Sequence, residues 1–252
     1  MSSTIIGLIT AGCTFGGTLI GIWLQKRLPG HHLNKDAYEI VKLSSGMLAT
    51  VTALVLGLLV SSAKSTYDTI NEGIKQESAK IILLDRTLAQ YGPDAQAVRD
   101  QLKRSVTASL EAALLRKPAG APGLAVQVTN RVEAVQGLLR ELTPQTEGQR
   151  QLLMQANQIA GDMAQTRWLL MEEAQNELPL PLLVILICWL TIIFASFGLF
   201  SPRNATVITL LLVCACSMAA AIFLILELNR PLDGFIKVSS APLRNVMEHL
   251  GH

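Results

Sequence analysis

One carboxylate occupies a position where neighbouring side chains at helical spacing are apolar. Glu77 lies between Ile74 and Ile81, at alternating three- and four-residue steps. A carboxylate on such a face is costly unless it is paired or hydrated. Two hypotheses follow. A ring of Glu77 side chains in an oligomer faces an aqueous lumen and favours cations, or a basic residue of an adjoining helix pairs with Glu77 inside the fold.

A second group of charged residues follows the last hydrophobic run, in the stretch ELNRPLDG. Glu227 and Arg230 are three residues apart and can pair on one helix face. Pro231 prevents the helix from continuing, and Asp233 with Gly234 favours a turn. Because Ca²⁺ needs several oxygen ligands and this stretch contains no acidic run, we interpret these five residues as an interfacial hinge.

Signatures of catalysis, cofactor binding and metal binding are missing from the sequence. It contains no P-loop, no GxSxG and no HExxH. His31 and His32 are adjacent without a third ligand at helical spacing, and the four cysteines lie in apolar runs. The net charge of +2 comes without a basic patch. We therefore predict that the protein is not an enzyme, holds no cofactor or metal, and binds no nucleic acid.

The composition is that of a membrane protein. Half of the residues are hydrophobic and 16% are charged, and the mean hydropathy is +0.39. Four runs are long enough to cross a bilayer, which needs about 20 apolar residues; they cover residues 4–24, 44–63, 180–200 and 205–228. None has a charge near its centre, which argues against a proton relay at bilayer depth. The first run contains Gly12, Gly16, Gly17 and Gly21, whose two small-xxx-small spacings predict close helix packing.

The second hydrophobic run continues in helical register without a Pro or Gly where it leaves the membrane. Its continuation has a heptad seam that ends before Gly92 and Pro93. The seam residues are Tyr67, Ile70, Ile74, Ile81, Leu84, Leu88 and Tyr91. Apolar residues at helical spacing predict three further helices, over residues 94–116, 124–142 and 144–176.

These patterns predict an all-α membrane protein in which a helical soluble lobe is inserted between the second and third spans. The expected parts are spans one and two with their loop (1–63), the lobe (64–178), spans three and four (179–228), and an interfacial turn with an amphipathic tail (229–252). With four spans, both termini and the lobe share one side of the membrane. Basic residues are equally frequent near the two sides, so charge does not decide the orientation.

Four stretches resemble a known family. SSAKSTYDTINEGIKQESAK, TRWLL, FASFGLFSPRNA and LILELNRPLDGFIKVSSAPLR are similar to the bestrophin-like family of bacterial membrane proteins, a family without an established function. The name implies a distant likeness to bestrophins, which are pentameric anion channels. Their second membrane helix lines a hydrophobic neck, and their lobe and termini are cytosolic. The resemblance thus implies a multi-pass protein of the bacterial inner membrane with a cytoplasmic lobe.

The resemblance does not extend to two bestrophin features. Bestrophin necks use phenylalanines, and residues 44–63 contain none. Bestrophins also have an acidic calcium clasp after the last span, where this chain has only Glu227 and Asp233. Neither anion selectivity nor calcium gating is therefore expected from the resemblance.

The leading hypothesis is a homo-oligomeric, channel-like protein of the lipid bilayer, a pentamer by analogy, which passes inorganic ions. A stripe at heptad spacing on the second span would line the axis. The candidate pore-lining residues are Met47, Val51, Leu54, Leu58, Ser61, Ser65 and Glu77. A hydrophobic constriction of this kind gates by dewetting. The same stripe is also compatible with helix packing, and the alternative function is a non-conducting scaffold or sensor whose lobe binds a cytoplasmic partner.

Overall fold

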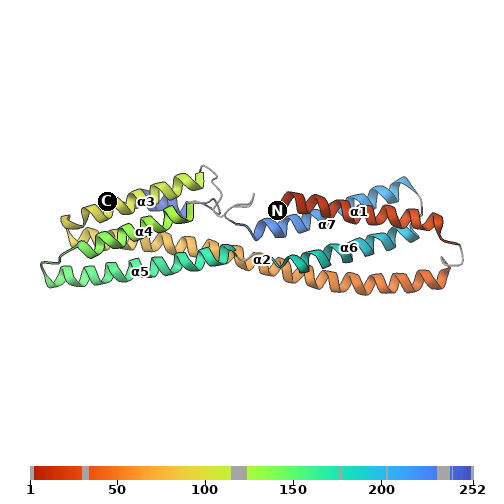
Figure 1. Cartoon of the computed structure of the whole chain (residues 1–252), viewed down its shortest axis with the longest axis horizontal. Coiled ribbons are helices and arrows are strands. Elements are labelled where there is room, and N and C mark those ends of the chain that lie inside the picture. Colours follow the sequence, from red (N-terminus) through yellow and green to blue (C-terminus); the bar gives the residue numbers. More distant parts are fainter. Residues whose placement is uncertain are drawn as a thin grey trace. The chain divides into compact units, whose positions relative to one another are not determined.

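The computed structural model describes residues 3–29, 34–114, 124–175, 178–202, 204–231, 239 and 241–250, and these contain helices and no strand. The helices are α1 (Ser3–Arg27), α2 (Lys35–Tyr91), the short 3₁₀ helix η2 (Pro93–Ala95), α3 (Gln96–Leu114), α4 (Leu124–Glu141), α5 (Glu147–Gln175), α6 (Leu180–Phe200), α7 (Ala205–Leu228) and α8 (Ala241–His249) (Figure 1). The chain divides into two compact units, the first Met1–Ser65 with Glu177–Asn229 and the second Thr66–Asn176 with Arg230–His252.

The predicted hydrophobic helices are confirmed. Within the described ranges, four helices are long and apolar enough to cross a membrane, namely α1, α2, α6 and α7. Helix α2 continues without interruption from the second hydrophobic run to Tyr91, as its sequence predicts. Gly92 ends it with a φ of 116°, a left-handed conformation that glycine adopts without strain.

The start of α2 differs from the sequence prediction. The helix begins at Lys35, whereas the apolar run begins at residue 44. The Asn34 side chain accepts a hydrogen bond from the backbone N–H of Ala37 at 2.8 Å, and Asp36 adds a negative charge to the first turn. Both features stabilise a helix N-terminus. Hydropathy locates the apolar part of a helix, but this polar cap determines where the helix begins.

In the first unit, α1 packs against α6 and α7 (Figure 1). The buried residues of α1 are small. The buried positions of α1 recur at heptad spacing and comprise Ser3, Gly7, Thr10, Thr14, Gly17, Thr18 and Gly21. The large apolar side chains of the same helix, such as Leu8, Ile20 and Trp23, are exposed. This inverted arrangement is typical of a helix that contacts neighbours with its small residues and lipid with its large ones.

Only one of the two small-xxx-small spacings in α1 makes a close helix contact. A Cβ atom added at Gly17 would lie 2.7 Å from the Thr191 backbone oxygen, and one at Gly21 would clash with the Ala195 oxygen. Gly12 and Gly16 have nothing within 4 Å of an added Cβ. The close helix packing predicted from both spacings is therefore found within the chain for Gly17 and Gly21.

The membrane part of α2 joins the same unit through one face. Its buried residues pack with those of α6 and α7 in a single apolar cluster. The cluster consists of Leu59, Ala63, Leu183, Leu186, Leu190, Ile222 and Ile225. This contact determines which face of α2 is turned away from the rest of the unit.

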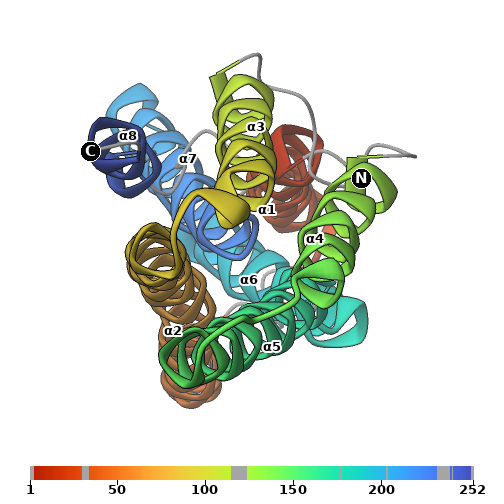
Figure 2. The same cartoon turned by 90° about the vertical axis from the view of Figure 1, so that its left-hand side faces the viewer.

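In the second unit, the later part of α2 packs with α3, α4, α5 and α8 around one hydrophobic core (Figure 2). The predicted seam of α2 faces this core, where Ile81, Leu84, Leu88 and Tyr91 are buried. Leu84 and Leu139 are fully buried in it. The seam predicted from heptad spacing is therefore confirmed as an interface between helices of one chain.

The C-terminal helix α8 is part of this second core. Val246 of α8 and Leu250, which directly follows the helix, are buried within the cluster, and the Thr107 hydroxyl lies 3.6 Å from the sulfur of Met247. The sequence predicts a tail that folds back onto the lobe or onto the membrane surface, and the structure places α8 on α3. The tail is thus a structural element of the second unit.

Candidate functional site

The apolar stripe of α2 is exposed on the single chain. Met47, Leu54 and Leu58 are 68%, 70% and 66% exposed, respectively. Val51 lies between them on the same face and is also exposed. No described helix covers any of the four side chains. If this stripe is a packing surface, it therefore contacts lipid or another copy of the chain.

The opposite face of the same helix is buried. Thr52, Leu59 and Ala63 are each no more than 5% exposed. Leu59 and Ala63 belong to the apolar cluster with α6 and α7. A helix with one face packed and a contiguous apolar face open lies at the edge of its bundle.

The stripe becomes polar toward the end of its hydrophobic run. Ser61 and Ser65 continue the heptad spacing after Leu58, and both side chains are exposed. The transition from leucine to serine occurs on the exposed face, so a surface that contacts this face meets an apolar band followed by hydroxyl groups.

Glu77 does not belong to this exposed face. The residue is only 8% exposed, and its carboxylate lies inside the second unit. The Arg167 Nη2 of α5 donates a hydrogen bond to its Oε1 at 3.1 Å. Of the two hypotheses for Glu77, the buried pair with a basic residue is the one found within the chain. Glu77 is therefore removed from the set of pore-lining candidates, because its side chain points into the helical core.

Three further hydrogen bonds join α2 to α5, on either side of this pair. The Thr66 hydroxyl donates to Oε1 of Glu173 at 3.0 Å. The Lys80 ammonium donates to the Thr166 hydroxyl at 2.7 Å and to the Asp162 backbone oxygen at 3.2 Å. The sequence interpretation did not anticipate these partners, because they are separated by 82 to 107 residues.

A second buried ion pair was also missed. The Arg99 guanidinium donates to both oxygens of Asp85, from Nε at 2.8 Å and from Nη2 at 3.1 Å. Asp85 is almost fully buried at the contact of α2 with α3. Hydrogen bonding to Asp85 raises the pKa of Arg99 above its ordinary value. The available signal was the position of Asp85 on the seam side of α2, four residues after Ile81.

The protonation of Glu77 reflects competition between burial and its partners. Burial raises the pKa of the carboxyl above its ordinary value of 4.5. The charges of Arg167 and Lys80, together with the hydrogen bond from Arg167, lower the pKa without cancelling that rise. The folded state therefore binds a proton at Glu77 more tightly than the unfolded chain does.

This shift predicts a pH dependence that Glu77→Gln removes. Between the unfolded pKa and the raised folded pKa, the folded state holds more protons, so the contribution of Glu77 to stability decreases as the pH rises. We expect the wild type to gain stability relative to Glu77→Gln as the pH falls toward 4.5. Amide hydrogen exchange of α2 and α5 peptides, compared between the two proteins at each pH, measures this difference. A relative gain with rising pH would show that the ion pair outweighs burial.

The interfacial hinge is described only in part. Helix α7 ends at Leu228, and the Asn229 backbone N–H donates to the Ile225 oxygen at 3.1 Å. Glu227 and Pro231 are buried. Asp233 and Gly234 lie outside the described residues. The predicted stop of the helix before Pro231 is thus confirmed, and the role of the five residues as a hinge stays a prediction.

No candidate metal centre is found in the described part of the chain, which has no group of three or more His, Cys, Asp or Glu side chains close enough to share an ion. His31 and His32 fall outside the described residues. The cysteines Cys13, Cys188, Cys214 and Cys216 are free and exposed on their helices.

Comparison with known families decides the relationship of this chain. A sequence model described as the bestrophin-like domain matches residues 12–243. The chain belongs to the bestrophin-like family. No curated protein and no solved structure matches the chain. The family resemblance predicted from the four sequence stretches is confirmed.

The fold brings two of those stretches of the bestrophin-like chain together. SSAKSTYDTINEGIKQESAK contains Thr66, Glu77 and Lys80, and TRWLL contains Thr166 and Arg167. The Glu77–Arg167 and Lys80–Thr166 contacts connect these two stretches across α2 and α5. Residues of these two family-like stretches therefore make polar contacts between α2 and α5 in the second unit.

Proposed function

We propose that this bestrophin-like chain is one subunit of a homo-oligomeric ion channel whose axis is lined by the membrane part of α2. The observation that carries the proposal is the exposed stripe of Met47, Val51, Leu54 and Leu58, which is opposite to the packed face of the same helix. Copies that surround an axis with this face would enclose an apolar constriction, followed by the hydroxyls of Ser61 and Ser65. Such a constriction controls conduction by dewetting.

The second unit then forms a soluble lobe inserted between the second and third spans. Support comes from the length of α2, which has 57 residues. At about 1.5 Å per residue this helix is roughly 85 Å long, whereas the hydrocarbon core of a bilayer is about 30 Å thick. Helices α3, α4, α5 and α8 carry charged residues throughout and pack with the part of α2 beyond the apolar run. The proposed lobe keeps the boundaries predicted from the sequence (64–178), and the tail (229–252) is added to it.

The proposed location is the bacterial inner membrane, with the lobe and both termini in the cytoplasm. The family assignment and the four apolar helices support a multi-pass membrane protein. The orientation and a pentameric assembly are proposed by likeness to bestrophins. The partners of the chain are then the lipid bilayer, further copies of itself and the inorganic ions that it conducts.

The conductance of the purified protein in planar bilayers tests the proposal. We expect discrete currents from a ring-sized oligomer, whose mass is determined in the same detergent. Leu54→Ala and Leu58→Ala widen the apolar constriction and lower the cost of wetting it, so the open probability should rise at least severalfold. Leu210→Ala is the matched control, because Leu210 is a 61% exposed leucine of α7 outside the stripe.

Two results would contradict this function. If a well-folded oligomer gave no current in the bilayer, the proposal that the protein is a channel would be rejected. If Leu54→Ala and Leu210→Ala changed the open probability equally, the proposal that α2 lines the pore would be rejected.

A second candidate function is a non-conducting scaffold or sensor whose lobe binds a cytoplasmic partner. It is favoured by the exposure of two neighbouring apolar residues of α5, Trp168 and Leu169, which are 62% and 59% exposed. Exposed aromatic residues are enriched where proteins bind one another. Loss of a cytoplasmic partner from a Trp168→Ala variant, together with a silent bilayer, would favour this candidate over the channel.

A further inference from the structure

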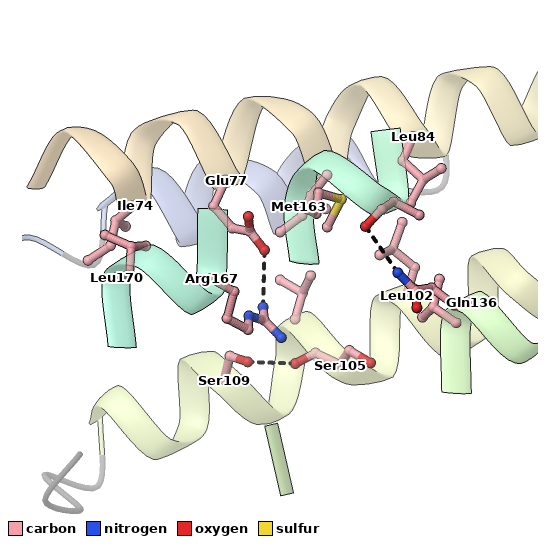
Figure 3. A pocket seen from close by; sticks show the side chains of 14 residues that line it. Ile74, Glu77, Leu84, Leu102, Ser105, Ser109, Gln136, Met163, Arg167 and Leu170 are labelled. Atoms are coloured by element: carbon pink, nitrogen blue, oxygen red, sulfur yellow. Dashed lines mark hydrogen bonds and ion pairs between the residues drawn. The ribbon is translucent and has the colours of Figure 1, made fainter. Parts of the chain in front are cut away.

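The helical core of the second unit contains a cavity that the channel proposal does not use. The cavity has a volume of about 190 Å³ and lies between α2, α3, α4 and α5 (Figure 3). Protein interiors are close-packed, and few voids in them exceed a water molecule in size. An apolar cavity of about 150 Å³ holds a benzene molecule, so this cavity is large enough for a ring of that size.

Apolar side chains make up most of the cavity wall. Nine of the fourteen described lining residues are apolar, and all four helices contribute to them. They include Leu84 of α2, Leu102 of α3, Val135 of α4 and Met163 of α5, all of which are buried. A water molecule in a cavity needs about two to four polar partners, which this part of the wall does not supply. An apolar molecule therefore matches it better than water does.

Five polar side chains complete the described wall. The Ser105 and Ser109 hydroxyls donate to backbone oxygens of their own helix, and the Gln136 amide donates to a backbone oxygen of α5. Arg167 donates to Oε1 of Glu77, and Oε2 of this carboxylate is buried beyond the reach of a ligand. The wall thus carries hydroxyl oxygens that accept and N–H groups that donate. Because both kinds of partner are present, the polar groups select neither a donor nor an acceptor, and the apolar side chains decide the ligand.

The charges at the cavity favour a neutral ligand. Glu77 and Arg167 are the two charged residues of the described wall, and they form an ion pair at 3.1 Å. An ionic ligand would lose its hydration without gaining a counter-ion that is not already paired. The cavity therefore suits a molecule without a charge.

We infer that this cavity is a binding site for a small, neutral, apolar molecule about the size of benzene, such as an aromatic or cyclic hydrocarbon. The flexible side chain of Met163 allows the wall to adapt to the shape of the ligand. Because the ligand would contact all four helices, binding would stabilise their packing. The inference is independent of whether the protein conducts ions.

Benzene tests the inference, with a methionine methyl group of the wall as the reporter. The full chain in nanodiscs is labelled with ¹³C at its methionine methyl groups, and the free benzene concentration in water is fixed through the vapour. We expect a saturable shift of the Met163 methyl signal, which is assigned by its loss in Met163→Leu. Met154 is the internal control, because it lies on the same helix, is 59% exposed and does not line the cavity. Benzene that only dissolves in the lipid would give no saturable shift at Met163.

Pyridine and phenol test the class of the ligand. Pyridine keeps the shape of benzene and adds an acceptor, whereas phenol adds a donor. Both should bind more weakly than benzene, pyridine by at least about tenfold, because each gives up hydrogen bonds to water when it enters an apolar cavity.

Cavity-filling variants locate the site. Ser105→Leu fills the cavity from α3 at the expense of a hydrogen bond within its own helix, and it should weaken benzene binding at least about tenfold. Ser109→Leu fills the same cavity and replaces that variant if its fold is lost. Ala108→Leu is the matched control, because it enlarges a side chain of the same helix outside the cavity. It should leave the affinity for benzene unchanged.

Three outcomes would overturn the inference. They are a Met163 signal that shows no saturable shift, an affinity for benzene in both serine variants equal to that of the wild type, and binding of pyridine or phenol as tight as that of benzene.

Discussion

Replacing Arg167 with alanine is expected to destabilise the second unit by about 3 kcal/mol, because it leaves the Glu77 carboxylate buried without its cation. The Glu77 side chain is only 10% exposed and that of Arg167 is 24% exposed, so solvent screening of the pair is limited. The loss should be largest at neutral pH and smaller in acid, where burial favours protonation of Glu77.

Native-state hydrogen exchange of α2 peptides that contain Leu84 and Leu88 measures this change. Both side chains are nearly inaccessible in the core, so their amides report on opening of the whole unit. A loss of about 3 kcal/mol accelerates exchange by roughly a hundredfold. Arg150→Ala is the control, because Arg150 lies on the same helix in an exposed pair with Glu147. It should change exchange by less than about fivefold.

The double variant Glu77→Leu with Arg167→Met separates the cost of a broken pair from the value of an intact one. Replacing both members of a buried pair with apolar residues is often neutral or stabilising. We therefore expect it to recover most of the loss caused by Arg167→Ala. A double variant as unstable as Arg167→Ala would mean that the pair itself holds the helices together.

The second large effect is expected at the contact of α1 with α6. Gly21→Ala and Gly198→Ala should each destabilise the first unit by about 3 kcal/mol, the upper end of the usual overpacking cost. A Cβ at Gly21 would meet the backbone oxygen of Ala195, and one at Gly198 would meet that of Thr18. Backbone atoms cannot rotate away as the end of a flexible side chain can, so the two helices must separate.

The control for this prediction lies in the same helix. Gly12→Ala and Gly16→Ala add the same methyl group where nothing lies within 4 Å. They should be neutral or stabilise α1 slightly, because alanine favours a helix over glycine. Thermal unfolding of the detergent-solubilised protein is monitored by size-exclusion chromatography. Its midpoint should fall by on the order of 10 °C relative to the wild type in Gly21→Ala and Gly198→Ala. Equal midpoints for all four variants would show that α1 and α6 are not in close contact.

Hydropathy and periodicity predict the helices of this protein because both are local properties of the chain. Apolar runs predict the four candidate spans, and heptad spacing predicts both the continuity of α2 and its buried seam. The residue types of the Pro231 and Gly92 segments predict two helix ends for the same reason, since the backbone limits of proline and glycine act on their own neighbourhood. The four family-like stretches were also recognisable without any three-dimensional information.

Tertiary structure decides which of several equivalent local patterns is used. The spacing of Gly12 and Gly16 is the same as that of Gly17 and Gly21, and only the second faces α6. Glu77 was recognised as an unusual seam residue, but its partner is 90 residues away on α5. The sequence around Asp85 and Arg99 gave still less indication that these two residues pair. The sequence alone therefore determined which helices form and which of their faces are apolar, because those properties depend on neighbours along the chain. The charged pairs and the close helix contact were decided only when packing brought distant helices together.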